Sequence, residues 1–434
     1  MVRNLRLRSQ AMLSKDDNDL LTQTGPGTPG GDLLRSYWQP IATDDEMPPG
    51  GDPVPVRILS EDMVLFRDDQ DRLGLIGLHC PHRGSDLSYG RIEDGGLRCL
   101  YHGWLFDVEG NCIDQPGEPE DKKFCQKVRH TAYPVEQKGG VIWCYMGDGE
   151  APLIPDYQFL TAPEENRMAF RVIQQCNWLQ GLESSTDLAH TSYLHRMGAA
   201  KDAAGNSTGN PYYSEDIHPK LDIEHTSFGV RIHSLRKTRD GKNYLRVNNY
   251  IYPCGTTPTM GAPPAEGYQG RWYVPRDDES HCRFEFIYRR EGALDKEFWG
   301  QMKATNVGPD KQHIRRAENR YMQDRGEITR GETFAGLGRY IPAHDAYAIE
   351  TQGKIQDRTQ EHLGSTDIVI IEVRKALLAA IKKMQAGGEA PGLLRDLKHN
   401  QFPDFICTAQ FIGDDEDGPA YCRRVLGPGK QAAE

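Results

Sequence analysis

The sequence predicts an α+β protein in which a small antiparallel β domain precedes a larger domain, an antiparallel sheet surrounded by helices. Three observations carry this prediction. Segments with alternating apolar residues begin at Val54. A stretch rich in Gly, Pro and acidic residues at 147–155 separates the two halves. Beyond it, strand-like segments at 229–235, 244–252, 271–274 and 282–288 are interleaved with helical patterns, as in α+β domains. The most amphipathic helix is expected from Ile368 to about Met384. The length of 434 residues also favours two domains over one core.

Residues 1–48 are predicted to form a helical segment that packs on the rest of the chain. A cap-like Ser14 opens the first helix pattern, a Gly/Pro-rich stretch follows at 25–31, and a second short helix is expected around Leu33 to Trp38. The first eight residues carry three arginines but no apolar core, so we do not expect them to be a secretory signal.

Residues 49–150 are predicted to form the β domain. Short apolar or alternating segments within it indicate strands at 54–58, 63–66, 73–78, 97–100, 104–108 and 141–146. Turn residues separate them at 68–71 and at 110–111. Two of these strands lead directly into Gly-bounded loops, and a pair of such loops can clamp a metal cluster.

The two loops carry a repeated Cys/His pattern that is the most specific signal in the chain. Cys80 and His82 form the first pair, and Cys99 and His102 form the second, with sixteen residues between the pairs. Two thiolates and two imidazoles are the ligands of a Rieske [2Fe–2S] centre, where the cysteines hold one iron and the histidines the other. The alternatives are two unrelated Cys-His loops or a zinc site. The Cys-x₂-Cys and His-x₃₋₅-His pairs usual for zinc are absent from this motif.

A second metal site is predicted downstream. Glu183, Asp187 and His190 are spaced as neighbours on one helical face. His190 and His195 are five residues apart, which in a regular helix would separate them by about 140°. Both can reach one ion only if the helix ends or distorts between them, so we expect irregular backbone near Ser192.

Two imidazoles and one carboxylate, with coordination positions left open, are the ligands of non-haem Fe(II) oxygenases. The candidate carboxylate is Asp345, whereas Asp357 and Asp367 are more typical of helix caps or ion pairs. The competing interpretation makes His190 and His195 solvated residues of a surface helix. A cluster in the same chain favours iron, because the cluster would deliver electrons to it one at a time.

Composition excludes several functional classes. The formal charge of −11 makes a nucleic-acid partner unexpected, and no run of eighteen apolar residues is present to span a membrane. The eight cysteines outside the cluster motif show no disulfide framework, as expected for reduced thiols of a cytoplasmic protein. We therefore do not expect the extra disulfide or the membrane anchor of respiratory-chain Rieske proteins.

The chain resembles the oxygenase (alpha) component of the Rieske non-haem iron aromatic-ring oxygenases over nearly its full length. The subfamily resemblance is to the phthalate dioxygenase branch, which includes aromatic O-demethylases. It rests on residues 25–29 near Trp38, on Asn177-Trp178, on the run from Glu183 to His195, and on residues 357–364.

The resemblance implies that residues 151–434 form a catalytic domain with a mononuclear Fe(II). It also implies a homotrimer or a hexamer of stacked trimers, supplied with NAD(P)H electrons by a flavin and iron–sulfur reductase, directly or through a ferredoxin. Asp187 would then bridge a cluster histidine of one protomer to His190 of its neighbour. Its other possible role is a plain hydrogen bond to His190 within the chain.

The expected reaction uses O₂ to hydroxylate an aromatic ring, or to hydroxylate a methoxy carbon that is then lost as formaldehyde. A carboxylated substrate would require a cation in the pocket, because a guanidinium recognises a carboxylate bidentately. Candidates lie on strand-like segments, although exposed charges or Arg–acid pairs are the alternative for each: Arg231, His233, Arg236 and Arg246. Residues 244–252 and 255–264 are candidate pocket walls. The alternative function is a Rieske-type electron carrier without oxygenase activity.

Overall fold

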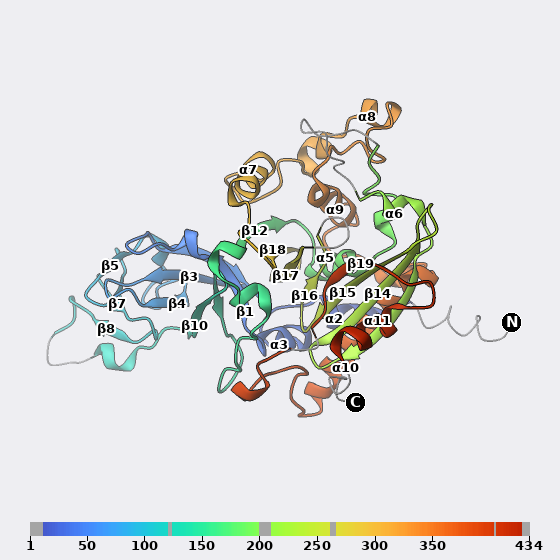
Figure 1. The fold of residues 1–434 in the computed structure, drawn as a ribbon. Coiled ribbons are helices and arrows are strands. Elements are labelled where there is room, and N and C mark those ends of the chain that lie inside the picture. Colours follow the sequence, from blue (N-terminus) through green and yellow to red (C-terminus); the bar gives the residue numbers. More distant parts are fainter. Residues whose placement is uncertain (1–11, 120–123, 199–209, 261–265, 403–404, 428–434) are drawn as a thin grey trace.

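The computed structural model describes residues 12–119, 124–198, 210–260, 266–402 and 405–427. The predicted leader and part of the predicted pocket wall, residues 261–264, lie outside these ranges. Small β-sheets form one end of the molecule, and a large sheet with helices around it forms the other (Figure 1). The predicted α+β architecture is therefore confirmed. Among the helices of the described ranges, none combines the length and apolar character needed to cross a membrane.

The N-terminal segment contributes two helices and a strand. Helix α2 (Lys15–Thr22) begins where the Ser14 hydroxyl accepts a hydrogen bond from the N–H of Asp17, as a cap residue should. Helix α3 (Pro29–Arg35) ends before the predicted second helix does, because the chain turns at Ser36 and enters strand β1 (Gln39–Thr43). Both helices pack against the long helix α10 of the second part.

Three antiparallel sheets make up the first part of the chain. The six predicted segments correspond to β2, β3, β4, β6, β7 and β11, whereas β1, β5, β8, β9 and β10 were not predicted. One sheet has the order β1-β11-β10, the next β2-β3-β4-β9, and the third β5-β6-β7-β8. Their bounds are β2 (Val54–Ile58), β3 (Glu61–Arg67), β4 (Leu73–Gly77), β5 (Arg91–Glu93), β6 (Gly96–Arg98), β7 (Leu105–Phe106), β8 (Cys112–Asp114), β9 (Ala132–Tyr133), β10 (Val135–Lys138) and β11 (Val141–Cys144).

One large antiparallel sheet organises the second part. Its order is β12-β18-β17-β16-β15-β14-β13, and β19 pairs with β15. The four strand-like segments predicted after residue 155 correspond to β14, β15, β17 and β18. The bounds are β12 (Arg167–Gln174), β13 (Lys220–Thr226), β14 (Gly229–Lys237), β15 (Asn243–Ile251), β16 (Gly255–Thr257), β17 (Gly267–Asp277), β18 (Ser280–Arg289) and β19 (Thr408–Ile412).

Helices cover this sheet on more than one side. In the view of Figure 1, α7, α8 and α9 lie above it and α3 and α10 lie below it. Helix α10 coincides with the amphipathic helix predicted from Ile368 to about Met384. The bounds are α4 (Gln158–Thr161), α5 (Trp178–Thr186), α6 (Tyr212–Glu215), α7 (Lys296–Asn306), α8 (Arg325–Thr329), α9 (Ile341–Glu350), α10 (Ile368–Gln385) and α11 (Gly418–Leu426).

Candidate metal centres and substrate cavity

The two Cys/His loops are built alike. In each loop the cysteine N–H donates to the carbonyl five residues later, and a glycine four residues later donates back to the cysteine carbonyl. Gly84 closes the loop of Cys80 and Gly103 closes that of Cys99, at N···O distances of 2.8 and 3.0 Å. Both glycines have φ near +75°, a conformation that residues with a side chain rarely adopt. The repeated motif thus produces two matching turns that face one another.

The loops place two thiols inside and two imidazoles outside. Cys80 and Cys99 are buried, and burial next to the second thiol raises the pKa of Cys80 to about 11. His82 and His102 lie toward the surface with their ring centroids 4.4 Å apart, and His82 stacks on Trp104 at 4.5 Å. A sulfur pair beneath a nitrogen pair fits a cluster with two different iron environments. Metal binding would supply the positive charge that deprotonates the buried thiols.

The predicted break in the helix before His195 is confirmed, and it comes earlier than Ser192. Helix α5 ends at Thr186, and residues 190–192 form a short 3₁₀ turn. The carboxylate of Asp187 accepts from the N–H groups of Ala189 and His190, at 2.7 and 3.3 Å, in place of the next helical bonds. His190 therefore does not share a helical face with Glu183, contrary to the prediction.

Three predicted ligands converge on one point. Nε2 of His195 lies 3.0 Å from Nε2 of His190 and 3.0 Å from Oδ1 of Asp345, which projects from α9. Oδ1 of Asp345 is also 3.6 Å from Nε2 of His190. This buried oxygen has no hydrogen-bond partner among the described residues. Two imidazole nitrogens and one unpartnered carboxylate oxygen at these distances fit a bound cation, with other coordination positions left for exogenous ligands.

Neighbouring charged and polar groups set the ionisation of Asp345 and the orientation of His190. Burial opposes ionisation of Asp345, but the two histidines and Arg271 outweigh burial and hold the pKa of the carboxyl below its usual value. Nδ1 of His190 lies 3.4 Å from Oδ2 of Asp187. A carboxylate on the far nitrogen of a ligating imidazole fixes its tautomer and orientation. The two other acidic residues considered for the site cap local turns instead, Asp357 through Thr359 N and Asp367 through Gly364 N.

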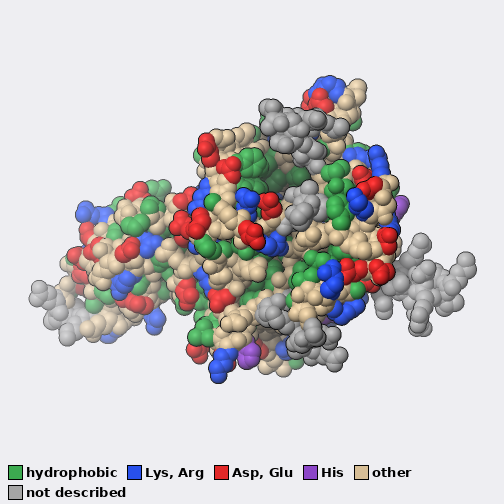
Figure 2. Space-filling view, viewed as in Figure 1, with side chains coloured by type: hydrophobic (Ala, Val, Ile, Leu, Met, Phe, Trp, Pro, Cys, Tyr) green, Lys and Arg blue, Asp and Glu red, His purple; other side chains and the backbone are tan. Residues whose placement is uncertain are grey.

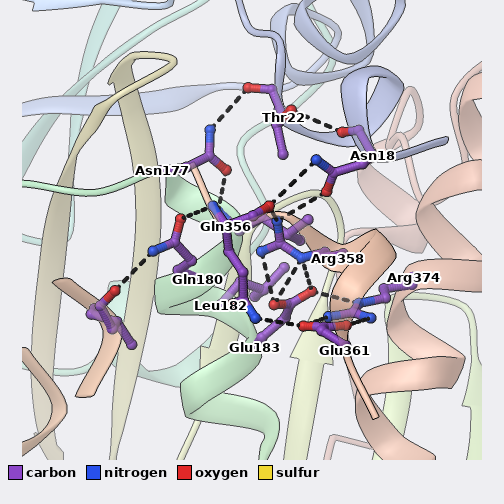
Figure 3. A network of polar contacts seen from close by, with 12 residues as sticks. Asn18, Thr22, Asn177, Gln180, Leu182, Glu183, Gln356, Arg358, Glu361 and Arg374 are labelled. Carbon is purple, nitrogen blue, oxygen red and sulfur yellow. Dashed lines mark hydrogen bonds and ion pairs between the residues drawn. The ribbon is translucent and has the colours of Figure 1, made fainter. Parts of the chain in front are cut away.

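Glu183 belongs to a buried ion network and not to the group of His190, His195 and Asp345 (Figure 3). Its carboxylate accepts hydrogen bonds from Nε of Arg358 at 3.0 Å and from Nε of Arg374 at 2.6 Å. Arg374 also pairs with Glu361, and Arg358 reaches Asn18 on α2. Two acids and two guanidinium groups balance within the network. It ties α2 and α10 to α5, the helix that leads to Asp187.

A cavity of about 930 Å³ opens onto the His190, His195 and Asp345 group. Figure 2 shows this face of the molecule hollowed between the helices. Apolar walls come from Phe170 on β12 and from Trp299 on α7, together with Leu294, Met302, Leu188 and Met260. The volume, and a lining that combines these apolar side chains with many polar and charged ones, suit a small organic ligand with polar substituents.

Of the four cationic candidates, Arg246 lines this cavity. Arg231 forms an ion pair with Glu224 at 3.1 Å, which was the alternative expectation, and Nε2 of His233 lies 2.7 Å from the same carboxylate. Cys422 lies close to Glu224 and His233, and the spacing of these three side chains resembles that of a further metal site. The guanidinium already bound to Glu224 opposes a cation there.

Arg236 has a different role, because its Nη2 donates to the carbonyl of Leu188 at 2.8 Å and so braces the loop between α5 and His190. Sequence analysis missed two further residues. Asn248 lines the cavity two positions after Arg246 on β15. His344 lies behind the metal group, with Nδ1 3.5 Å from Nδ1 of His195 and 3.0 Å from the Leu194 carbonyl oxygen. The usable signal for Asn248 was its spacing of two residues from the candidate Arg246, because residues i and i+2 of a strand share a face.

Comparison with known proteins finds a matching family for each of the two parts of the chain. The family model of the Rieske [2Fe-2S] domain matches residues 37–133, and the model of the LigXa C-terminal domain like family matches residues 144–410. The sequence is 36% identical to the phthalate 4,5-dioxygenase oxygenase subunit of Pseudomonas putida, with 96% of each chain covered. It is 33% identical to the 5,5'-dehydrodivanillate O-demethylase oxygenase subunit of Sphingobium sp. (strain NBRC 103272 / SYK-6), over 89% of this chain and 84% of the relative.

Solved structures share the fold at low sequence identity. Dicamba monooxygenase bound to dicamba superimposes with a TM-score of 0.57 at 18% identity, over 82% of this chain and 99% of that one. An oxygenase and ferredoxin complex of carbazole 1,9a-dioxygenase gives 0.55 at 18% identity, over 84% and 94% of the two chains.

Proposed function

Because the chain belongs to the Rieske non-haem iron oxygenases, as an oxygenase subunit, we propose that it hydroxylates a carboxylated aromatic compound held in the 930 Å³ cavity. Cys80, His82, Cys99 and His102 would hold the [2Fe–2S] cluster, and His190, His195 and Asp345 the mononuclear iron. When bound, these groups supply one-electron transfer and O₂ activation. The protein's own residues bind the substrate, orient it and exclude water.

Arg246 is the observation that supports a carboxylated substrate. Its side chain is 3% exposed and lines the cavity, and Nη1 has no hydrogen-bond partner among the described residues. Nε donates to the Thr259 hydroxyl at 3.0 Å, which holds the guanidinium in place. A buried cation with an unused donor is costly unless a ligand pairs with it, and a carboxylate is the matching partner.

The position of the substrate carbon nearest the metal would decide between ring hydroxylation or dihydroxylation and O-demethylation. The apolar wall formed by Phe170, Leu294 and Trp299 would hold the ring and keep bulk water out. Asp187 would act as a catalytic residue by holding His190 and by passing electrons from a neighbouring protomer's cluster histidine. The contact of Asp187 with His190 supports the first role.

Electrons would come from a flavin and iron–sulfur NAD(P)H reductase, directly or through a ferredoxin like the one in the carbazole 1,9a-dioxygenase complex. A homotrimer, or a hexamer of stacked trimers, is supported by the separation of the two sites within one chain. Strands β4 and β7, which border the cluster loops, lie apart from α9, which carries Asp345 (Figure 1). Apolar side chains next to the cluster loops offer a contact surface, since Tyr89, Leu100 and Tyr101 are all more than half exposed. A cytoplasmic location is supported by ten cysteines that are all free within the described residues.

The alternative of a Rieske-type electron carrier has less support. A carrier has no use for the convergence of His190, His195 and Asp345, and the relatives that match along most of the chain are oxygenase subunits.

The test is turnover with reductase, NADH and a panel of a phthalate, a methoxybenzoate and a biaryl acid, each beside its neutral amide. We expect O₂ uptake with an acid and little with its amide, and formaldehyde if a methoxy group is lost. Arg246→Gln should raise KM for the acid about 100-fold and leave KM for the amide unchanged. Arg231→Gln is the matched control, because Arg231 pairs with Glu224 and does not line the cavity. Equal use of acid and amide by the native enzyme would overturn the proposal.

A further inference from the structure

A second polar side chain lies beside Arg246, and a carboxylate alone would leave part of it without a partner. Asn248 follows Arg246 by two positions on β15, so both project from the same face of that strand. Both line the cavity and each is 3% exposed. Neither Oδ1 nor Nδ2 of Asn248 has a hydrogen-bond partner among the described residues. A whole buried amide left unpaired on the wall of a substrate cavity indicates a ligand group that pairs with it.

The chemistry of the amide defines that group. Nδ2 donates, and can join Arg246 Nη1 on an oxygen of the substrate. Oδ1 only accepts, so it needs a donor on the substrate. A carboxylate or a methoxy group has no proton to donate, and a second carboxylate would repel Oδ1. A hydroxyl group donates to Oδ1 and is the common donor on an aromatic acid.

We infer that Arg246 and Asn248 together select an aromatic acid that also carries a free hydroxyl group, with Asn248 reading the hydroxyl. This inference rests on the proposed function and narrows its substrate class. The roots of the two side chains are about 7 Å apart along the strand, enough to address two substituents of one ring. A site built to hydrogen-bond a substrate hydroxyl discriminates strongly against the analogue that lacks it, because its own buried polar groups then stay unpaired.

Two polar neighbours on the cavity wall already have hydrogen-bond partners, whereas the amide of Asn248 has none among the described residues. Gln269 Oε1 accepts from Arg271 at 2.7 Å, and Ser185 contacts Thr256 at 2.7 Å. Asn249, next in sequence, is on the opposite face of β15 and donates to Thr257 and to the Ile406 carbonyl. It therefore serves as a matched control that shares the strand but not the cavity.

The experiment measures dissociation constants by calorimetry on the anaerobic holoenzyme without reductase, so that no turnover occurs. The probes are 4-hydroxy-3-methoxybenzoate and 3-methoxybenzoate, which differ in the hydroxyl alone. We expect the native enzyme to bind the hydroxylated acid at least about 100-fold more tightly. Asn248→Leu should remove that difference by weakening only the hydroxylated acid. Asn249→Ala should keep the ratio, whatever it does to stability.

The outcomes separate this inference from the proposed function. The carboxylate proposal fails if the enzyme neither binds nor turns over the two acids but does bind and turn over their neutral amides. If both acids bind with similar constants, or if Asn248→Leu leaves the ratio unchanged, the role of Asn248 is wrong although Arg246 still anchors the acid. The native comparison needs no variant, so a misfolded Asn248→Leu protein would not block the test. Arg246→Gln should weaken both acids equally.

Discussion

Asp187 and His190 meet through Oδ2 and Nδ1 at 3.4 Å, on the side of the imidazole opposite the nitrogen that faces His195 and Asp345. Burial opposes a charged imidazole, but Asp187 outweighs it and raises the pKa of His190. The carboxylate therefore acts on the candidate iron ligand without being one. It is placed there by the end of α5, three residues before the histidine.

Replacing Asp187 with Asn should leave both metal centres occupied and lower turnover by about 100-fold. The amide keeps the size of the side chain and removes its charge from the His190 ring. Iron content, the visible spectrum and coupled NADH consumption check the three parts of this expectation. Coupled activity close to the native level would count against any role for Asp187 in electron delivery.

Replacing His82 with Cys should lower the reduction potential of the cluster, on the order of 100 mV or more, because thiolate ligands stabilise the oxidised state. The change should also alter the visible spectrum. His79 provides the control, since its Nδ1 lies against the Gly84 carbonyl at 3.2 Å on the same loop. His79→Asn should preserve the spectrum, and an unchanged spectrum in His82→Cys would show that His82 is not a ligand.

Replacing Asp345 with Ala should reduce the iron content from about three to about two atoms per chain and spare the cluster absorbance. The expected loss follows from the removal of one ligand in three. Asp357→Asn is the comparison variant, because Asp357 caps a turn through Thr359. If Asp345→Ala kept three irons per chain, Asp345 would not be the carboxylate ligand, and the ligand would have to be another residue.

Replacing Glu183 with Gln should destabilise the fold by about 3–5 kcal/mol, because two buried guanidinium groups lose a shared partner. Arg358 and Arg374 are 0% and 3% exposed, so water cannot replace the carboxylate. Urea unfolding measures the change. Asp19→Asn removes an exposed pair with Lys15 and should leave the free energy of unfolding nearly unchanged, because water screens that pair. If both variants lost a similarly small part of the free energy of unfolding, the network would contribute little to stability.

His281 should make the fold sensitive to acid. Its ring nitrogens face the Cys176 carbonyl and Gln174 Oε1, and burial lowers its pKa to about 4. Since the unfolded chain binds this proton near pH 6.5, stability is full above that pH and falls as the pH drops toward 4. Between pH 7 and pH 5 the loss from this group is about 2 kcal/mol.

The measurement compares urea unfolding at pH 7 and pH 5 for the native chain and for His281→Gln. The variant should lose about 2 kcal/mol less than the native chain over this interval. Equal losses in the two proteins would show that His281 is not buried in its neutral form.

Local sequence was sufficient for the parts of this protein that depend on neighbouring residues. The strand segments at 54–58 and 63–66, the two Cys/His turns and the long helix from Ile368 all follow from short-range periodicity and turn chemistry. The spacing of His190 and His195 also required a break in α5, because no regular helix can bring both rings to one ion.

Tertiary structure decided which side chains face one another. Every residue of β15 is buried, so alternation cannot tell its cavity face from its core face. The neighbouring strands and α5 made Arg246 and Asn248 cavity residues, while contact with Glu224 removed Arg231 from the candidates. Glu183 has the sequence spacing of a site residue, but Arg358 and Arg374, more than 170 positions away, direct it into the core. Such pairings depend on segments far apart in the chain, and no local pattern contains them.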